Sequence, residues 1–310
     1  MSAATIPLGL PRTVLRLHRI AAWLWIAFVV VTGALLLWLW GPATAGLDIP
    51  HCDPAVACTA KGATADSYHY VLTLTDMLIT LVPVAASVFA GGLLIGRELS
   101  RGTAQLAWTQ SVSPARWLAA KLYVPAISLV LGTTVLVLLR RLVASAAPGL
   151  SDNRWHVSTT TYDALGPTVV ALSLLGLAIG AVVALLTRRT LPAATYSLIA
   201  TAAVAGVLDA IRDRLWPTVT VTGDVREGYP YFAGSMTTEG ALTGSGARVA
   251  DPVCVDDRGC LASHNITGFY REGHPPSHFW PLQLIETGLI LTLTAAATAT
   301  AFYLLRRRAR

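Results

Sequence analysis

Four cysteines are the residues of this 310-residue chain whose spacing most directly suggests a covalent or metal-binding chemistry. They form two C-x5-C pairs, Cys52 with Cys58 and Cys254 with Cys260. Cysteines in such pairs form disulfides in oxidising compartments, so we expect two local bridges. Two alternatives remain open: a cross-loop pairing of the same cysteines, and a metal site in which the first pair is joined by His51 and His69.

Charged residues near one end of apolar segments are the second group that could do chemistry. They are Asp76, Arg140, Arg141 and Glu286. A lone charge in a bilayer is costly, so such groups usually pair or line a wet cavity. We interpret them as an outer gate in which an arginine latches a carboxylate. The alternative is that they reach up to the headgroups. A surface cluster is expected from three further charges at helical spacing, Asp209, Arg212 and Asp213.

No catalytic motif is recognisable in the chain. The string GGLLIGRE at 91–98 is the nearest to a P-loop, but it lacks the lysine that would reach the phosphates. The hydrolase patterns HExxH and GxSxG are absent. An intramembrane enzyme built on histidines is therefore a weak alternative, with these candidates: His156, His264, His274 and His278. We expect a chain that is not an enzyme and holds no metal, so that any ATP would be hydrolysed by a partner.

The stretch GRELSRGTAQLAWTQSVSPARWLAAKL at 96–122 is polar, basic and flanked by apolar runs. Its pattern predicts two helices, one from near Arg97 to about Gln110 and one that begins after SVSP. Ser113 suits the position before a helix and Pro114 the first helical position. The second helix should run directly into the next apolar segment, so the stretch forms a helical hairpin.

These residues must be positioned by membrane-spanning helices. Of the chain, 54% is hydrophobic and 13% charged, whereas soluble domains carry about 25% charged residues. Six apolar segments are near the roughly 20 residues that a spanning helix needs. We place them at about 20–40, 71–95, 122–139, 164–186, 191–211 and 280–303. A GxxxG motif from Gly176 to Gly180 suits close helix packing inside one subunit, and a dimer seam is the alternative.

The basic residues predict the orientation of these spans. They concentrate in residues 1–19, 96–121, 187–190 and 304–310. Cytoplasmic segments carry the excess of Lys and Arg, so both termini and the hairpin are expected in the cytoplasm. The net charge of +6 is then a topology signal and indicates no nucleic-acid partner. We expect one all-α membrane domain without a soluble domain, in which the outer loop at about 212–279 caps the helices and has a strand near 218–222.

The hairpin resembles the coupling segment of ABC exporter permeases of the second type. The resemblance covers an acid, Arg-Gly-Thr, Gln-x-Val-Ser, Arg-Trp and a terminal Lys. In this chain the matching residues are Arg97, Glu98, Arg101, Gly102, Thr103, Gln110, Ser113, Arg116, Trp117 and Lys121. Pro114 stands where that family has a basic residue, and the charge follows at Arg116. The six spans, the cytoplasmic termini and the long last outer loop also fit the family.

The resemblance implies a permease subunit that pairs with a second copy and with two copies of an ATPase that binds ATP and Mg. It implies export of a substrate across the cell membrane, and the apolar spans favour a lipophilic or amphipathic molecule such as a drug-like compound, a lipid or a small peptide. Three alternatives remain: a proton-coupled secondary transporter that uses Asp76 and Glu286, a sensor or scaffold subunit, and a hairpin that only anchors the chain to lipid.

Overall fold

The computed structural model describes residues 19–47, 63–109, 112–148, 150, 154–156, 158–254 and 257–308. Within these residues, six helices are long and apolar enough to cross a membrane. They extend over Arg19–Ala43, Thr64–Ser100, Pro114–Ala146, Thr168–Thr187, Thr190–Arg214 and Pro276–Arg307. The six expected spans are confirmed, and the second, third and sixth are longer than their apolar cores suggested.

The spans are assembled from regular and irregular helical pieces. The first joins α2 (Arg19–Trp38) to a π-helical segment, η1 (Leu39–Ala43), and the second joins α3 (Ala63–Val88), the π-helical η2 (Phe89–Gly96) and α4 (Arg97–Ser100). The short α5 (Thr103–Thr109) and α7 (Thr159–Ala164) flank the third span. The remaining pieces are α6 (Pro114–Ala146), α8 (Thr168–Thr187), α9 (Thr190–Ile211) with η4 (Arg212–Arg214), and η5 (Pro276–His278) with α11 (Phe279–Arg308).

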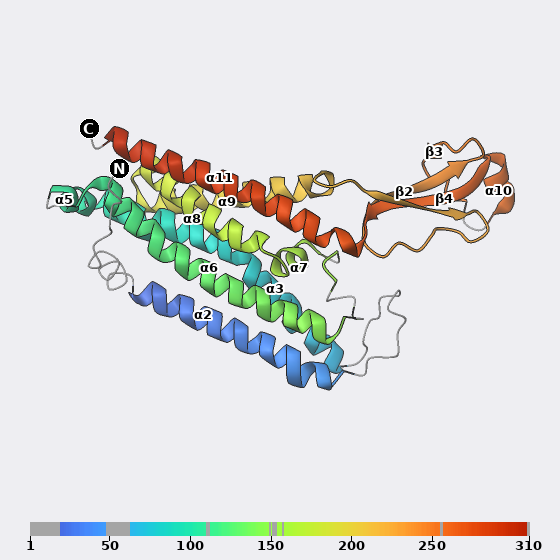
Figure 1. The fold of residues 1–310 in the computed structure, drawn as a ribbon, viewed down its shortest axis with the longest axis horizontal. Helices are drawn as coiled ribbons and strands as arrows, with labels where there is room; N and C mark the ends of the chain where they lie inside the picture. The colour runs from blue at the N-terminus through green and yellow to red at the C-terminus, as the bar shows by residue number, and fades with distance from the viewer. Residues whose placement is uncertain are drawn as a thin grey trace.

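Helix α8 lies at the centre of the bundle, and four of the other spans pack around it (Figure 1). In its apolar stretch 67% of the residues are buried, against 17% for α2 and for α11. It packs against α3, α6, α9 and α11, whereas α2 lies along one edge and packs on α6 and α3. The start of α2, the end of α11 and α5 all lie at one end of the bundle, and α7 lies near the other.

The GxxxG motif explains the central position of α8. A Cβ atom at Gly176 would lie 2.2 Å from the carbonyl oxygen of Pro83, and one at Gly180 would lie 2.4 Å from that of Ser87. Both distances are shorter than the 3.0 Å below which real Cβ atoms essentially never make contacts, so only glycine lets the backbones of α8 and α3 approach this closely. The motif therefore packs within one subunit, as its preferred interpretation predicted.

The loop between the last two spans folds as a four-stranded antiparallel sheet, so the all-α expectation is wrong for this segment. The strands are β1 (Val219–Asp224), β2 (Ser235–Thr243), β3 (Arg248–Val249) and β4 (Ile266–His274), in the order β1-β4-β2-β3. The strand expected near 218–222 is β1. The sheet extends away from the helix ends instead of lying across them (Figure 1). Its small core includes Ala241, Leu261 and Phe269.

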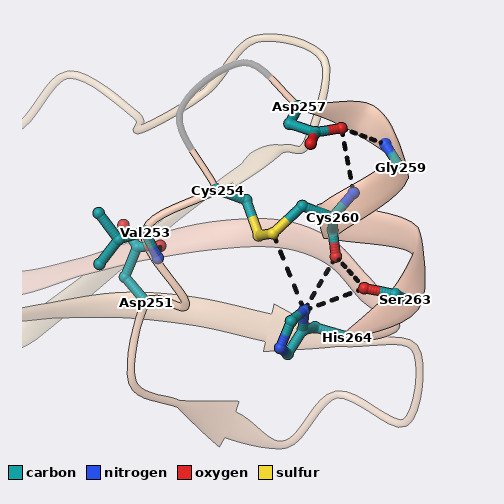
Figure 2. Close-up of a disulfide and its surroundings, with 8 residues drawn as sticks. All are labelled: Asp251, Val253, Cys254, Asp257, Gly259, Cys260, Ser263 and His264. Carbon is teal, nitrogen blue, oxygen red and sulfur yellow. Dashed lines mark hydrogen bonds between the residues drawn. A yellow bond between two sulfur atoms is a disulfide. The ribbon is translucent and has the colours of Figure 1, made fainter.

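A disulfide closes the far end of this sheet. Cys254 and Cys260 are bonded, with their Cα atoms 5.6 Å apart (Figure 2). Asp257 caps the short helix α10 (Arg258–Ser263) by accepting from the backbone N–H groups of Gly259 and Cys260. One of the two expected local bridges is thus confirmed, while Cys52, Cys58 and His51 lie outside the described residues.

Among the described residues, Cys254, Cys260 and His264 are the one cluster of three side chains close enough to share a metal ion. Both sulfur atoms are taken up in the disulfide, so neither is the free thiolate that binds metals. The imidazole Nδ1 of His264 lies 2.9 Å from the carbonyl oxygen of Cys260, to which it donates its proton.

The close packing of α8 predicts the effect of adding a single methyl group. We expect Gly180→Ala to destabilise the chain by about 1–3 kcal/mol, because the new Cβ forces α3 and α8 apart. Gly206→Ala is the matched control, since nothing lies within 4 Å of a Cβ there. That variant should be neutral or more stable by about 0.4–1 kcal/mol. Thermal unfolding in detergent measures both, and equal effects at the two glycines would contradict the packing.

Candidate functional site

The sequence-predicted hairpin is present at one end of the bundle. Ser113 precedes α6, and its hydroxyl accepts from the backbone N–H of Arg116 at 3.4 Å. Pro114 is the first residue of α6, which continues without a break through the third span. The first arm differs from expectation because Gly102, with φ of +72°, adopts a left-handed conformation. That turn divides the expected single helix into α4 and α5.

Glu98 joins the two arms of the hairpin. One of its carboxylate oxygens lies 2.5 Å from Nζ of Lys121, and the other accepts from the indole N–H of Trp117 at 3.1 Å. Lys121 and Trp117 on α6 are each 4% exposed. The carboxylate therefore satisfies a buried ammonium and a buried indole at once, and it holds α4 against the start of α6. The ring of Trp108 on α5 meets that of Trp117 edge to face at 5.7 Å.

The exposed surface at the hairpin end of the bundle is basic. Arg97, Arg101 and Arg116 are exposed. The hydroxyls of Ser100 and Thr190 lie 3.1 Å apart, so the turn between α8 and α9 is beside α4. That turn brings two more exposed arginines to the same end, Arg188 and Arg189. Thr103 is exposed as well and its hydroxyl donates to the carbonyl of Glu98, whereas Gln110 lies outside the described residues.

A buried ion pair lies toward the opposite end. Asp76 on α3 is 2% exposed and Arg140 on α6 is fully buried. Their contact is bidentate, from Nε of Arg140 at 2.6 Å and from its Nη2 at 3.1 Å. The hydroxyl of Thr161 on α7 donates to the same carboxylate at 3.0 Å. The geometry is the one in which a buried charge is fully compensated, and it ties three elements together.

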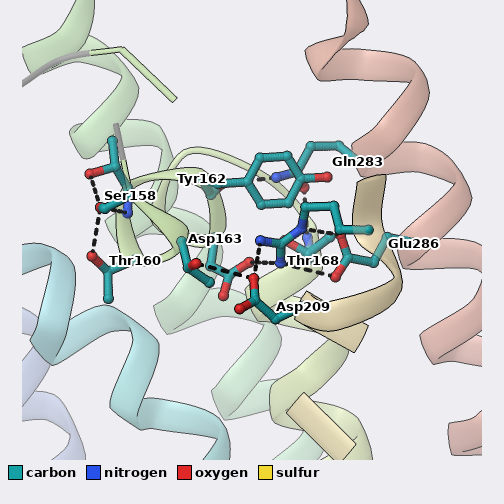
Figure 3. Close-up of polar contacts among 11 residues, drawn as sticks. Ser158, Thr160, Tyr162, Asp163, Thr168, Asp209, Gln283 and Glu286 are labelled. Atoms are coloured by element: carbon teal, nitrogen blue, oxygen red, sulfur yellow. Dashed lines mark hydrogen bonds and ion pairs between the residues drawn. The ribbon is translucent and has the colours of Figure 1, made fainter. Parts of the chain in front are cut away.

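A second buried network is built around Arg212. Its guanidinium donates to both oxygens of Glu286 on α11 at 3.1 and 3.2 Å, to Asp209 at 2.7 Å and to Asp163 at 3.1 Å. It also lies over the ring of Tyr162, 4.0 Å from the centroid. Figure 3 shows the side chains of Tyr162, Asp163, Asp209 and Glu286 converging from α7, α9 and α11.

The surface-cluster interpretation is therefore wrong for Arg212, which is 8% exposed. Of the expected gate residues, Asp76 and Arg140 pair directly, whereas Glu286 binds Arg212 instead of Arg140 or Arg141. Arg141 donates to the carbonyl of Leu165 at 3.3 Å and lies over the ring of Trp280 at 4.5 Å.

Helix α7 connects the two networks. Three consecutive residues face different partners: Thr161 binds Asp76, Tyr162 stacks on Arg212 and Asp163 pairs with it. Gln283, one turn before Glu286 on α11, donates to the carbonyl of Tyr162 at 2.9 Å and accepts from the backbone N–H of Thr168 at 3.2 Å. This short helix is thus held by α3, α9 and α11 together.

Asp163 is a titratable carboxyl group of this junction and lies outside the six spans. Burial raises its pKa to about 7; Arg212 lowers the pKa, and Glu286 and Asp209 raise it. Because the unfolded carboxyl ionises near 3.8, the folded chain binds a proton at Asp163 more tightly than the unfolded chain does. Its contribution to stability is fully present below that pH and is lost as the pH rises through about 7.

We therefore expect the stability difference between the wild type and Asp163→Asn to shift against the wild type as the pH rises from about 4 to about 8. Melting temperatures of the two proteins in detergent, measured across that range, provide the test. Asp209→Asn is the matched control, because its side chain is 46% exposed and bonded to the same arginine. A difference that stays constant with pH would show that Asp163 is not the titrating group.

A known protein family matches a large part of this chain. A family model described as ABC-2 membrane transporter related matches residues 24–212, which include the hairpin, the Asp76–Arg140 pair, α7 and Arg212. No curated protein and no solved structure matches the chain. Because the family model covers more than half of the chain and its first five spans, this multi-pass membrane protein belongs to the ABC-2 membrane transporter related family.

Proposed function

We propose that this chain is the membrane-spanning permease subunit of an exporter in the cell membrane, driven by a separate ATPase that binds ATP and Mg. The hairpin end is cytoplasmic in this proposal, and two ATPase copies dock beneath two copies of the chain. The observation that supports it is the structure of the hairpin. The Glu98–Lys121 ion pair fixes its first arm to the third span, and its exposed surface carries arginines.

Rigidity is what a coupling element needs. A push on α4 or α5 reaches α6 through the contacts of Glu98 with Lys121 and Trp117, instead of being absorbed by a loose loop. The exposed arginines of the hairpin and of the neighbouring turn favour a partner with acidic groups. Membrane lipid would also attract these cations, by about 1 kcal/mol each, so an experiment must separate coupling from anchoring.

The other end of the bundle serves as the outer gate. The ion pairs of Asp76 with Arg140 and of Glu286 with Arg212 close it, and α7 lies between them. Proton-coupled transport by Asp76 and Glu286 is less well supported, because each carboxylate is already held by a guanidinium group. Protonation of either carboxylate would remove part of the compensation of a buried arginine, which is costly. The apolar spans favour a lipophilic or amphipathic substrate.

The coupling role predicts the behaviour of Glu98→Gln. Glutamine is nearly the same size, but it cannot neutralise the buried ammonium of Lys121. A charged hydrogen bond contributes about 1.5–3 kcal/mol, so we expect substrate-stimulated ATP hydrolysis to fall by about tenfold or more. Insertion and expression should be unchanged. The measurement is the stimulated ATPase rate of the complex reconstituted in liposomes.

Two further variants make this test decisive. Glu239→Gln is the matched control, because it removes a carboxylate paired with Arg271 in the sheet, at the end of the molecule away from the hairpin.

Arg116→Ala removes an exposed cation without touching the Glu98 contacts, and we expect it to weaken ATPase binding. Wild-type stimulation in both Glu98→Gln and Arg116→Ala would sink the coupling role and favour a lipid anchor. If no ATPase co-purifies, the scaffold alternative is favoured.

The gate assignment predicts a change in accessibility. Ala164 on α7 is fully buried, so a cysteine there should resist a water-soluble thiol reagent. Replacing Asp76 by Asn together with Arg140 by Gln removes both charges of this pair, so neither is left to face the loss of the other. We expect this double variant to release α7 and expose Ala164→Cys to labelling from outside. A cysteine that stays protected in the double variant would contradict the gate.

A further inference from the structure

A cavity of about 580 Å³ lies between α2, α3 with η2, and α6, in the half of the bundle nearer the hairpin. We propose that it binds the hydrocarbon part of the exported cargo, a lipophilic molecule that enters sideways from the bilayer. The identity of the occupant as cargo rests on the proposed function, whereas the site itself rests on the geometry of this chain.

The size and lining of the cavity define the class of ligand. Pockets of about 300–1,000 Å³ hold drug-sized molecules. Among the side chains lining this cavity, the polar atoms belong to Trp25 and Ser128, and both are already bonded. The indole N–H of Trp25 donates to the carbonyl of Ser128 at 3.1 Å, and the Ser128 hydroxyl donates to that of Val124 at 3.1 Å. No lining side chain offers a free polar group, so the cavity suits hydrocarbon and disfavours water, sugars and ions.

The exposed fractions of the lining side chains show where the cavity opens. Its floor is buried, with Leu94, Val82 and Leu177 each at most 3% exposed. Its rim is exposed, with Leu24 on α2 at 66% and Leu81 on α3 at 56%. Both rim residues belong to spans, so within the part of the chain that the structure describes the opening between α2 and α3 faces the bilayer. A ligand dissolved in the bilayer could enter without crossing water.

The buried residues of α2 lie toward one end of the helix. Toward the end opposite the hairpin, Leu36 and Leu39 are fully buried in a cluster with residues of α3. Toward the hairpin, the ring of Trp25 packs on α6, where a Cβ at Gly132 would lie 2.5 Å from it. This contact holds α2 against α6 at this level, and the cavity lies beside it.

The cavity is placed where the hairpin could change its shape. Leu94 in η2 lies one turn before Glu98, and Pro125 in α6 lies one turn after Lys121. The helical segments that adjoin Glu98 and Lys121, η2 and α6, thus also form two walls of the cavity. Proline has no N–H to donate, and η2 is π-helical, so both walls are weakened helix at this level. A movement of the hairpin would therefore alter the walls and release the ligand.

Photolabelling of the full-length chain in liposomes, without any ATPase, tests the site. An alkyl diazirine probe should label residues 21–28 and 78–94, and an excess of unlabelled alkane should compete. We expect Ala22→Phe and Ala85→Phe, which fill the cavity from opposite walls, to lower this labelling by about tenfold. Ala203→Phe on α9 is the matched control, because Ala203 is exposed and lines neither this cavity nor a smaller one beside α6.

The alternative occupant is the acyl chain of a membrane phospholipid. A phospholipid that carries the diazirine in its acyl chain serves as the second probe, and it should label all lipid-facing helices evenly without competition. The proposal would be overturned if this phospholipid labelled the cavity as strongly as the alkyl probe does. It would also be overturned if Ala22→Phe and Ala85→Phe left the labelling by the alkyl probe unchanged. Failure of the Glu98→Gln test with cavity labelling intact would instead leave a lipophile site in a chain that is not coupled to an ATPase.

Discussion

Two buried guanidinium groups impose the strongest constraint on this structure. Arg140 and Arg212 lie in the helix bundle at most 8% exposed, and each must be compensated there because solvent cannot do it. Their partners come from α3, α7, α9 and α11, so the positions of those elements follow from the need to neutralise two charges. Helix α7 is too short to be stable alone, and it has its place because it supplies groups to both networks.

The glycines of α8 impose a second constraint, which is steric and acts on one side of the bundle only. Where Gly176 and Gly180 meet α3, the backbones touch and leave no space. Away from this contact, the indole of Trp25 on α2 packs on Gly132 of α6, and side chains of α2, α3 and α6 leave a cavity beside it. Helix α3 therefore touches the central helix closely and also borders the proposed ligand site.

Much of the helical architecture could be predicted from the sequence, because apolar length and basic flanks act locally. Ser113 and Pro114 specify the start of α6 through contacts within one turn. The left-handed turn at Gly102 was missed because RGT inside a helical pattern does not by itself require it. The partner of Glu286 was missed for a different reason: Arg212 lies 74 positions away, and its spacing to Asp209 also suits a surface cluster. The clue was charge balance, since a buried Glu286 needs a cation from another span.

The sheet shows more clearly that the sequence does not reveal which distant residues pair. The alternation of Val and Thr indicated β1, but β4, which pairs with both β1 and β2, follows its partners by tens of residues. Its strands hold their places through cross-strand contacts that no local pattern encodes. The local C-x5-C spacing, by contrast, was enough to predict the bridge between Cys254 and Cys260.

The path of the sheet has a mechanical consequence. Strand β1 leaves the bundle just after α9, and β4 returns to it just before α11, so their ladder begins between those two helices at Val219 and Gly273. At the same place the carbonyl of Asp213 accepts from the imidazole of His274 at 3.1 Å. If α9 and α11 moved apart, the load would fall on these near bonds first and open the ladder one rung at a time. The sheet would therefore open from the end nearest the last two spans, and the disulfide lies at its other end.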